Sequence, residues 1–238
     1  MSASQTLTIR RAAERGHADH GWLKAAHTFS FAGYFDPAWM HFGPLRVLNQ
    51  DVIAPGRGFG AHPHDNMEIV TWVLSGQLRH EDSMGNGAVL RAGDLQVMSA
   101  GSGLVHAEFN ASDEEPCHLL QMWIFPQGKD GQPWYRDRSV DLEARTGRLL
   151  QVVGPDEDAE TIDQDARFFV SRLLPGQEVG HEVSERRGAW LHVATGSVDV
   201  AGTRLEAGDA LGIRGAGSIA LQGAEEAEVV LWDLAGVR

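Results

Sequence analysis

The sequence contains a single cysteine, Cys117, among its 238 residues. No disulfide can form within the chain, and a site built from several thiolates, such as an iron–sulfur cluster, is excluded by count. Basic residues are also scarce, at 20 against 33 acidic ones, which gives a net charge of −13. Because no basic patch is apparent, direct binding to nucleic acid or to an anionic membrane is disfavoured.

Long apolar runs are missing as well. No uncharged apolar segment reaches the length of a membrane span, and the first 22 residues contain no apolar core of signal-peptide length. We therefore expect a soluble, cytoplasmic protein, a setting that also suits the lone thiol. Helical patterns are rare: only Asp19 to Ala26 and Val140 to Leu149 tolerate a helical interpretation, and neither has a convincing apolar face.

Glycine is abundant, with 28 residues spread along the chain as punctuation between short apolar runs. This pattern is typical of many strands joined by turns, so the sequence predicts an all-β protein. The strand-like runs are Leu45 to Val52, Glu68 to Leu74, Leu95 to Met98, Leu119 to Phe125, Arg167 to Leu174, Trp190 to Ala194 and Glu228 to Leu234.

An internal repeat divides the chain into two similar units. The segment WVLSG at Trp72 to Gly76 returns as HVATG at His192 to Gly196, and the turn Ala92-Gly93-Asp94 returns as Ala207-Gly208-Asp209. Such recurrence indicates two β units of the same kind. We predict an N-terminal arm over 1–26, a first unit over 27–136, a polar linker over 137–147 and a second unit over 148–238.

Four residues of the first unit form a candidate metal site. His62 and His64 are two residues apart, as are His106 and Glu108, so each pair projects from one face of an extended strand. Three imidazoles and a carboxylate suit iron(II), nickel, copper, zinc or manganese, and they leave coordination positions open to small molecules. An open position favours catalysis or sensing over a purely structural role.

The second unit serves as an internal control on this prediction. It keeps the turn glycines but loses the candidate ligands. The positions equivalent to His62, His64, His106 and Glu108 hold Glu182, Ser184, Leu221 and Gly223. Histidines needed only for the fold would more plausibly have been kept in both units, so we expect one metal site, in the N-terminal unit.

The motifs around these residues resemble those of a known family. The spacing Gly56-x5-His62-x-His64-x3-Glu68, followed by Gly93-x5-Ser99, resembles the two cupin motifs. More specifically, four segments are similar to pirin. They are HTFSFAGYFDP at 27–37, HPHDNMEIVTWVLSG at 62–76, HEDSMGN at 80–86 and MSAGSGLVHAE at 98–108. The resemblance implies a bicupin, with two β-barrels and one metal, usually iron, in the N-terminal barrel.

The resemblance also bears on the ligand set and the activity. In ordinary cupins the carboxylate ligand would be Glu68, whereas in pirins it would be Glu108, which we favour, with Glu68 as a supporting or substitute ligand. Pirins resemble quercetin 2,3-dioxygenases, which implies a flavonol and dioxygen as substrates, Glu108 as the base and carbon monoxide as a product. The alternative is a non-catalytic, redox-sensing regulator that acts through a protein partner.

Other residues receive structural interpretations. We expect His80 to be a solvated turn histidine and the Cys117 thiol to be buried and inert. His118 either lines the barrel or makes a structural hydrogen bond. Trp72, Met122 and Trp123 are expected in the core. His181 and His192 have no matching partner pair, so no site is assigned to either of them.

Overall fold

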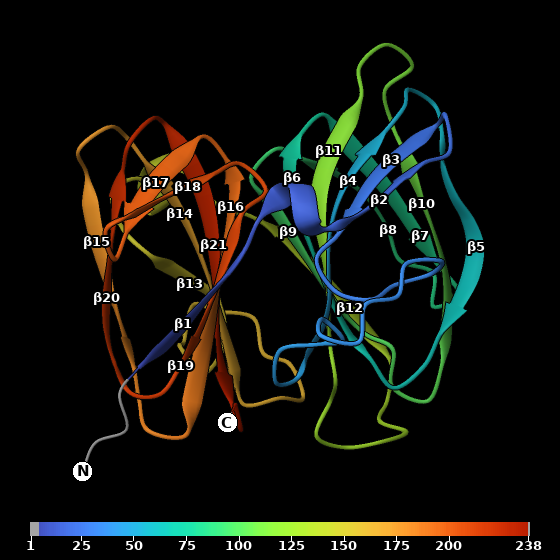
Figure 1. Ribbon diagram of the computed structural model, residues 1–238. Helices are drawn as coiled ribbons and strands as arrows, with labels where there is room; N and C mark the ends of the chain where they lie inside the picture. The colour runs from blue at the N-terminus through green and yellow to red at the C-terminus, as the bar shows by residue number, and fades with distance from the viewer. Residues whose placement is uncertain (1–4, 238) are drawn as a thin grey trace.

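The computed structural model describes residues 5–237 and is built almost wholly from β-strands arranged as two barrels side by side (Figure 1). The expected all-β fold is confirmed. The strands that form the barrel on the right of Figure 1 are β2 (Gly16–Asp19), β3 (Leu23–His27), β4 (Leu45–Ile53), β5 (Gly58–His64), β6 (Glu68–Ser75), β7 (Gln77–Asp82), β8 (Gly87–Arg91), β9 (Asp94–Ser99), β10 (Leu104–Asn110), β11 (Cys117–Ile124) and β12 (Trp134–Ser139).

The second barrel takes one strand from the start of the chain and the rest from its second half. They are β1 (Thr6–Arg10), β13 (Leu150–Val153), β14 (Ala166–Leu173), β15 (Glu178–Val183), β16 (Arg187–Thr195), β17 (Ser197–Val200), β18 (Thr203–Glu206), β19 (Ala210–Arg214), β20 (Gly217–Gly223) and β21 (Ala227–Ala235). Among the described residues, no helix is long or apolar enough to cross a membrane.

The two barrels have matching sheet orders, which explains the sequence repeat. Each consists of a large and a small sheet. The large sheets run β12-β9-β6-β11-β4-β3-β2 and β1-β19-β16-β21-β14-β13, and the small ones run β5-β10-β7-β8 and β15-β20-β17-β18. Strand β1 therefore pairs with β19 as β12 pairs with β9, so the N-terminal strand completes the C-terminal barrel. The domain boundaries given above remain predictions.

The helical interpretation of Asp19 to Ala26 is wrong, because this segment belongs to the β2–β3 hairpin. Along β3, Leu23, Ala25 and His27 are buried while Lys24 is exposed, which is the alternation of a strand. The second segment forms a single helical turn, α1 (Leu142–Arg145), and a 3-10 turn, η1 (Ala12–Glu14), follows β1.

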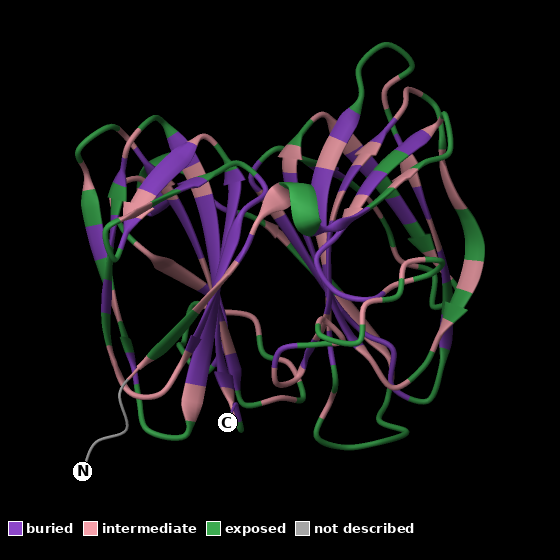
Figure 2. Cartoon of the chain, in the orientation of Figure 1, coloured by how far each residue is buried: buried purple, intermediate pink, exposed green. Residues whose placement is uncertain are grey.

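Apolar side chains gather in three places. One group lies between the two large sheets and includes Trp72, Met122, Trp190 and Trp232, all buried. Buried residues follow the strands of both barrels, whereas most of the exposed residues lie in the loops (Figure 2). A second fills the C-terminal barrel without interruption. Inside the N-terminal barrel, the apolar residues form two separate groups. The expectation that Trp72 and Met122 are core residues is confirmed.

Candidate metal centre

Polar side chains occupy part of the interior of the N-terminal barrel. The interior of the C-terminal barrel is filled by apolar side chains instead. His62 and His64 lie on β5, and His106 lies on the neighbouring antiparallel strand β10, directly opposite His62. The imidazole rings converge, with centroids 4.4 to 4.8 Å apart. Their nitrogen donors lie within 4.8 Å of one another. The structure therefore brings together the three histidines that the sequence singled out.

The backbone around the cluster depends on a close approach between β5 and β10. A Cβ atom on Gly58 would lie only 2.2 Å from the carbonyl oxygen of Glu108, so only glycine fits there without movement of the strand. The pairing register shifts between His106 and Glu108, which marks a bulge. Bulges redirect side chains, and this one changes how Glu108 projects relative to His106.

Two histidines present free nitrogen atoms suited to a metal. The Nδ1 atom of His62 lies 2.8 Å from the carbonyl oxygen of Gly60, so Nδ1 carries the hydrogen and Nε2 keeps its lone pair. The Nε2 atom of His106 is buried, with no hydrogen-bond partner among the described residues. A buried unpaired nitrogen is costly unless something binds it, so these residues fit a transition-metal ion.

Glu108 is buried and held from both sides. The amide of Gln96 donates to Oε1 at 2.9 Å, and the amide of Gln121 donates to Oε2 at 2.8 Å. The carboxylate lies within 4.8 Å of donor atoms of His106 and His80. These contacts fix the carboxylate at the edge of the three-histidine cluster.

Glu68, the other candidate carboxylate, lies outside both groups of potential ligands. It accepts a hydrogen bond of 2.7 Å from the Ser99 hydroxyl, and burial raises its pKa. Val70 and Trp72 share its face of β6, because residues two apart on a strand point the same way, and both belong to the apolar group between the barrels. Strand alternation thus places Glu68 on the face directed away from the histidines.

The prediction that His80 is a solvated turn residue is wrong. His80 is fully buried on β7, where its ring stacks on Tyr135 and its Nδ1 atom lies 3.5 Å from Nδ1 of His106. Its Nε2 atom lies 3.4 Å from the carboxylate of Asp82. The signal was present in the sequence, since His80 and Asp82 have the same two-residue spacing as the candidate ligand pairs. Sequence alone did not place β7 beside β10.

A cavity of about 170 Å³ opens beside the histidines. Its walls include the aromatic rings of Phe31, Phe59 and Trp123, together with Glu108 and Asp51. Trp123 meets His64 edge to face, with centroids 4.9 Å apart. The expectation that Trp123 is a core residue is therefore wrong, because its ring lines the cavity.

Electrostatics in this region reflect burial. Burial, followed by the neighbouring histidines, lowers the pKa of His64 to about 4 and that of His106 to about 3. Both imidazoles are therefore neutral at pH 7, which is the form that binds metals. Burial, followed by the charge of Glu108, raises the pKa of Asp51 to about 7.

These shifts predict how the metal-free protein responds to pH. The unfolded histidines take up protons near pH 6.5, whereas His64 and His106 in the folded protein do so only near pH 4 and 3. Below pH 6.5 the unfolded state is therefore favoured progressively, and this contribution to stability is lost as the pH falls. Between pH 7 and pH 4, the melting temperature of a His106→Gln variant is expected to fall less than that of the wild type. Thermal denaturation across that range measures the difference, and a variant of the exposed residue His41, His41→Gln, should follow the wild type.

The remaining sequence predictions have mixed outcomes. Cys117 is buried as expected, and burial raises the pKa of its thiol to about 12. His118 makes a structural hydrogen bond, with its Nε2 atom 3.0 Å from the amide nitrogen of Gln50. In the C-terminal barrel, Leu221 is buried in an uninterrupted apolar core, whereas Glu182 and Ser184 are exposed.

Two barrels of matching strand order, one of them with a polar interior, define a protein of the bicupin class. The chain belongs to the pirin family. It matches the Pirin family over residues 8–124 and the quercetinase C-terminal cupin domain over residues 151–234.

Individual relatives cover nearly the whole chain. The chain is 43% identical to quercetin 2,3-dioxygenase of Escherichia coli over 230 residues, which are 96% of this chain and 98% of that one. It is also 43% identical to a pirin-like protein of Caulobacter vibrioides, over 92% of this chain and 96% of that one. The crystal structure of the bacterial pirin YhhW from E. coli in complex with nickel(II) superimposes with a TM-score of 0.92 and 40% identity, covering 98% and 100% of the two chains.

Proposed function

We propose that the protein is a metal-dependent dioxygenase of the pirin type that opens the heterocyclic ring of a flavonol, such as quercetin, with release of carbon monoxide. The observation that carries this proposal is the cluster of three histidines beside the carboxylate of Glu108 at an aromatic cavity. The name of the E. coli relative supports the choice of reaction. The lone buried thiol suits the cytoplasm, where we expect the protein to act.

We assign His62, His64, His106 and Glu108 as the metal ligands. This set of nitrogen and oxygen donors accepts iron(II), nickel, copper, zinc or manganese. Iron(II) is our first choice on the family resemblance, and the nickel complex of the E. coli relative makes nickel the second. Once bound, a divalent ion would supply Lewis-acid polarisation of the substrate hydroxyl.

Glu108 would accept the proton of the flavonol 3-hydroxyl. The amides of Gln96 and Gln121 hold its two oxygens in place, so little reorganisation is needed before proton transfer.

The cavity would orient the flavonol and limit its contact with water. Phe31, Phe59 and Trp123 offer flat apolar faces to an aromatic ring. The volume of about 170 Å³ is below the roughly 300 Å³ at which pockets for drug-sized ligands begin. One ring of the flavonol would therefore enter the cavity, while the rest would lie at its mouth.

The test is aerobic turnover of quercetin by protein loaded separately with iron(II) and nickel. We expect loss of the flavonol absorbance together with release of carbon monoxide, and at least a roughly 100-fold lower rate in a His62→Ala variant, because a metal ligand is lost and the Lewis-acid contribution with it. The proposal fails if wild-type protein with verified metal content leaves the absorbance unchanged.

A further inference from the structure

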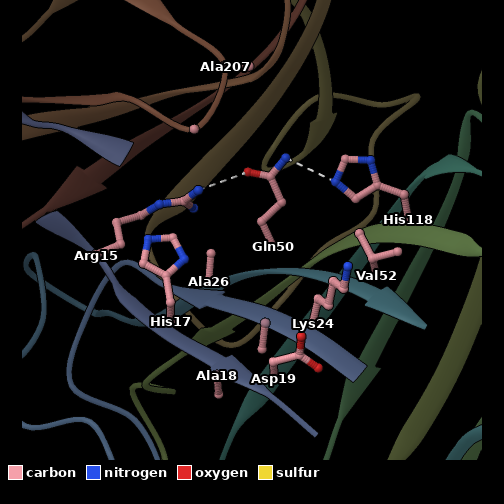
Figure 3. Close-up of a pocket in the computed structure, with 12 residues that line it drawn as sticks. Arg15, His17, Ala18, Asp19, Lys24, Ala26, Gln50, Val52, His118 and Ala207 are labelled. Carbon is pink, nitrogen blue, oxygen red and sulfur yellow. Dashed lines mark hydrogen bonds between the residues drawn. The ribbon is translucent and has the colours of Figure 1, made fainter. Parts of the chain in front are cut away.

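A second and larger cavity, of about 520 Å³, lies in the cleft between the two barrels (Figure 3). Strands β2, β3, β4 and β11 of the N-terminal barrel provide most of its wall. Ala207 and Gly208, in the turn between β18 and β19, close it from the C-terminal barrel. We call it the inter-barrel cleft.

The inter-barrel cleft is separated from the metal cavity by a single layer of sheet. Along β4, Asn49 and Asp51 face the cavity beside the histidines, while Gln50 and Val52 face the cleft. Strand alternation directs neighbouring residues to opposite faces in this way. A ligand in the cleft therefore could not touch the histidine cluster.

Arg15 places a buried positive charge at the cleft. It is 8% exposed, and among the described residues no carboxylate forms an ion pair with it. Its Nη2 atom makes only a long contact of 3.4 Å with Oε1 of Gln50, and its Nε and Nη1 atoms have no partner among those residues. A buried charge without a counter-ion is costly, so the guanidinium is well placed to attract an anion.

The nearest carboxylates do not serve as counter-ions for Arg15. Asp209 attracts Arg15 from a distance, but its carboxylate already accepts from Nη1 of Arg11 and from the backbone of Ala12, each at 2.7 Å. Asp51 also acts on Arg15 from a distance, and it faces the metal cavity on the other side of the wall. Burial lowers the pKa of Arg15 to about 10, so the group stays charged at pH 7.

The rest of the cleft suits a small anion that has an apolar body. Lys24 adds a second positive charge, and Asp19 is the acidic residue in the lining. Ala26 of β3 and Val52 of β4 turn their apolar side chains to the cleft beside these charged groups. In a chain with a net charge of −13, this local excess of positive charge is unusual.

The Gln50 side chain is held in place by residues of both barrels. Its amide nitrogen lies 2.9 Å from the carbonyl oxygen of Ala194 and 3.0 Å from Nε2 of His118, and its oxygen lies 3.2 Å from Nε2 of the fully buried His192. The side chain that contacts Arg15 is thus held in place across the cleft. Such preorganisation reduces the cost of ordering a site when a ligand binds.

We propose that the inter-barrel cleft binds a small organic anion, whose carboxylate or other oxyanion group pairs with Arg15 and whose apolar body lies against Ala26 and Val52. This site is distinct from the metal centre and does not depend on the proposed dioxygenase activity. An oxyanion held by a buried guanidinium gains a charge-assisted hydrogen bond, the stronger kind.

The test is calorimetric titration of metal-loaded protein with benzoate, with inorganic phosphate as an oxyanion that has no apolar body and with benzamide as a neutral analogue. We expect benzoate to bind at least ten-fold more tightly than phosphate or benzamide. An Arg15→Gln variant should weaken benzoate binding at least ten-fold. An Ala26→Leu variant, which fills the cleft without changing its charge, should weaken binding to the same extent and covers the case in which Arg15→Gln fails to fold.

Two control variants show whether benzoate binds in the cleft or elsewhere on the protein. Arg91→Gln removes one exposed positive charge outside the cleft and should leave benzoate affinity within two-fold of the wild type. His106→Ala disrupts the metal centre, where a carboxylate can also bind, and should likewise leave the affinity unchanged. The proposal is overturned if no benzoate binds, if benzamide binds equally well, if His106→Ala abolishes binding, or if both cleft variants bind benzoate normally.

Discussion

A His106→Ala variant is expected to retain less than about one tenth of the wild-type metal content after dialysis, and its flavonol turnover should fall at least 100-fold. His106 belongs to both groups of potential ligands, one with His62 and His64 and the other with His80 and Glu108, so its loss removes a ligand from each group. Removal of groups that only orient metal ligands already costs roughly 10–100-fold in affinity or activity, and a ligand should cost more. Elemental analysis and the aerobic assay on the same preparation measure both effects.

The matched pair for this experiment is Glu108→Gln and Glu68→Gln. Both residues are buried glutamates on strands of the N-terminal barrel, but only Glu108 faces the histidines. Glu108→Gln should lower turnover by roughly 10²–10⁴-fold, the contribution typical of a general base, even where metal remains. Glu68→Gln should keep both metal and turnover. The reverse pattern would show that the carboxylate ligand is Glu68, as in ordinary cupins.

A Trp190→Ala variant is expected to lower the free energy of unfolding by about 3–5 kcal/mol, the usual cost of deleting a fully buried tryptophan. Trp190, on β16 of the C-terminal barrel, packs against Phe29, Trp39 and Phe42, with ring centroids 4.9 to 6.0 Å apart. These three rings come from the segment that connects β3 and β4 of the N-terminal barrel, so the deletion leaves a void between the barrels. Thermal unfolding should shift by roughly 6–20 °C for a chain of this size.

The control for the tryptophan is Phe35→Ala, in the same aromatic segment. Phe35 is 72% exposed, so its removal should change the melting temperature by less than about 2 °C, as is usual for surface substitutions. A Trp190→Phe variant keeps much of the buried area and should fall between the two. If Trp190→Ala unfolds like the wild type, the barrels are not held together by this aromatic contact.

Most of the fold was readable from the sequence because its signals are local. The strand-like runs from Leu45 to Val52 and from Glu68 to Leu74 correspond to β4 and β6 almost residue for residue, since alternation and flanking turns mark strand limits. The repeat of Ala92-Gly93-Asp94 as Ala207-Gly208-Asp209 reflects equivalent turns in two barrels of the same sheet order. Residues 19–26 tolerate a helical interpretation because the order Asp-His-Gly-Trp-Leu-Lys-Ala-Ala has no strict alternation of apolar and polar residues to mark the hairpin.

Long-range pairing was not readable in the same way. That β1 completes the distant C-terminal barrel depends on contacts between Thr6–Arg10 and Ala210–Arg214, which no local pattern specifies. The burial of His80 has the same cause, because it follows from the pairing of β7 with β10. By contrast, the grouping of His62 with His106 was predictable. Residues two apart on a strand share a face, and the equivalent positions of the second unit hold no histidine.

Turnover at the histidine cluster is the central claim, and oxygen uptake tests it most directly. Iron- or nickel-loaded wild-type protein, supplied with quercetin in air-saturated buffer, should consume one dioxygen for each flavonol lost and release one carbon monoxide. Glu108→Gln protein at matched metal content should be at least roughly 100-fold slower. Wild-type protein that holds its full complement of metal yet consumes no oxygen would contradict this claim and favour a metal-binding regulatory protein.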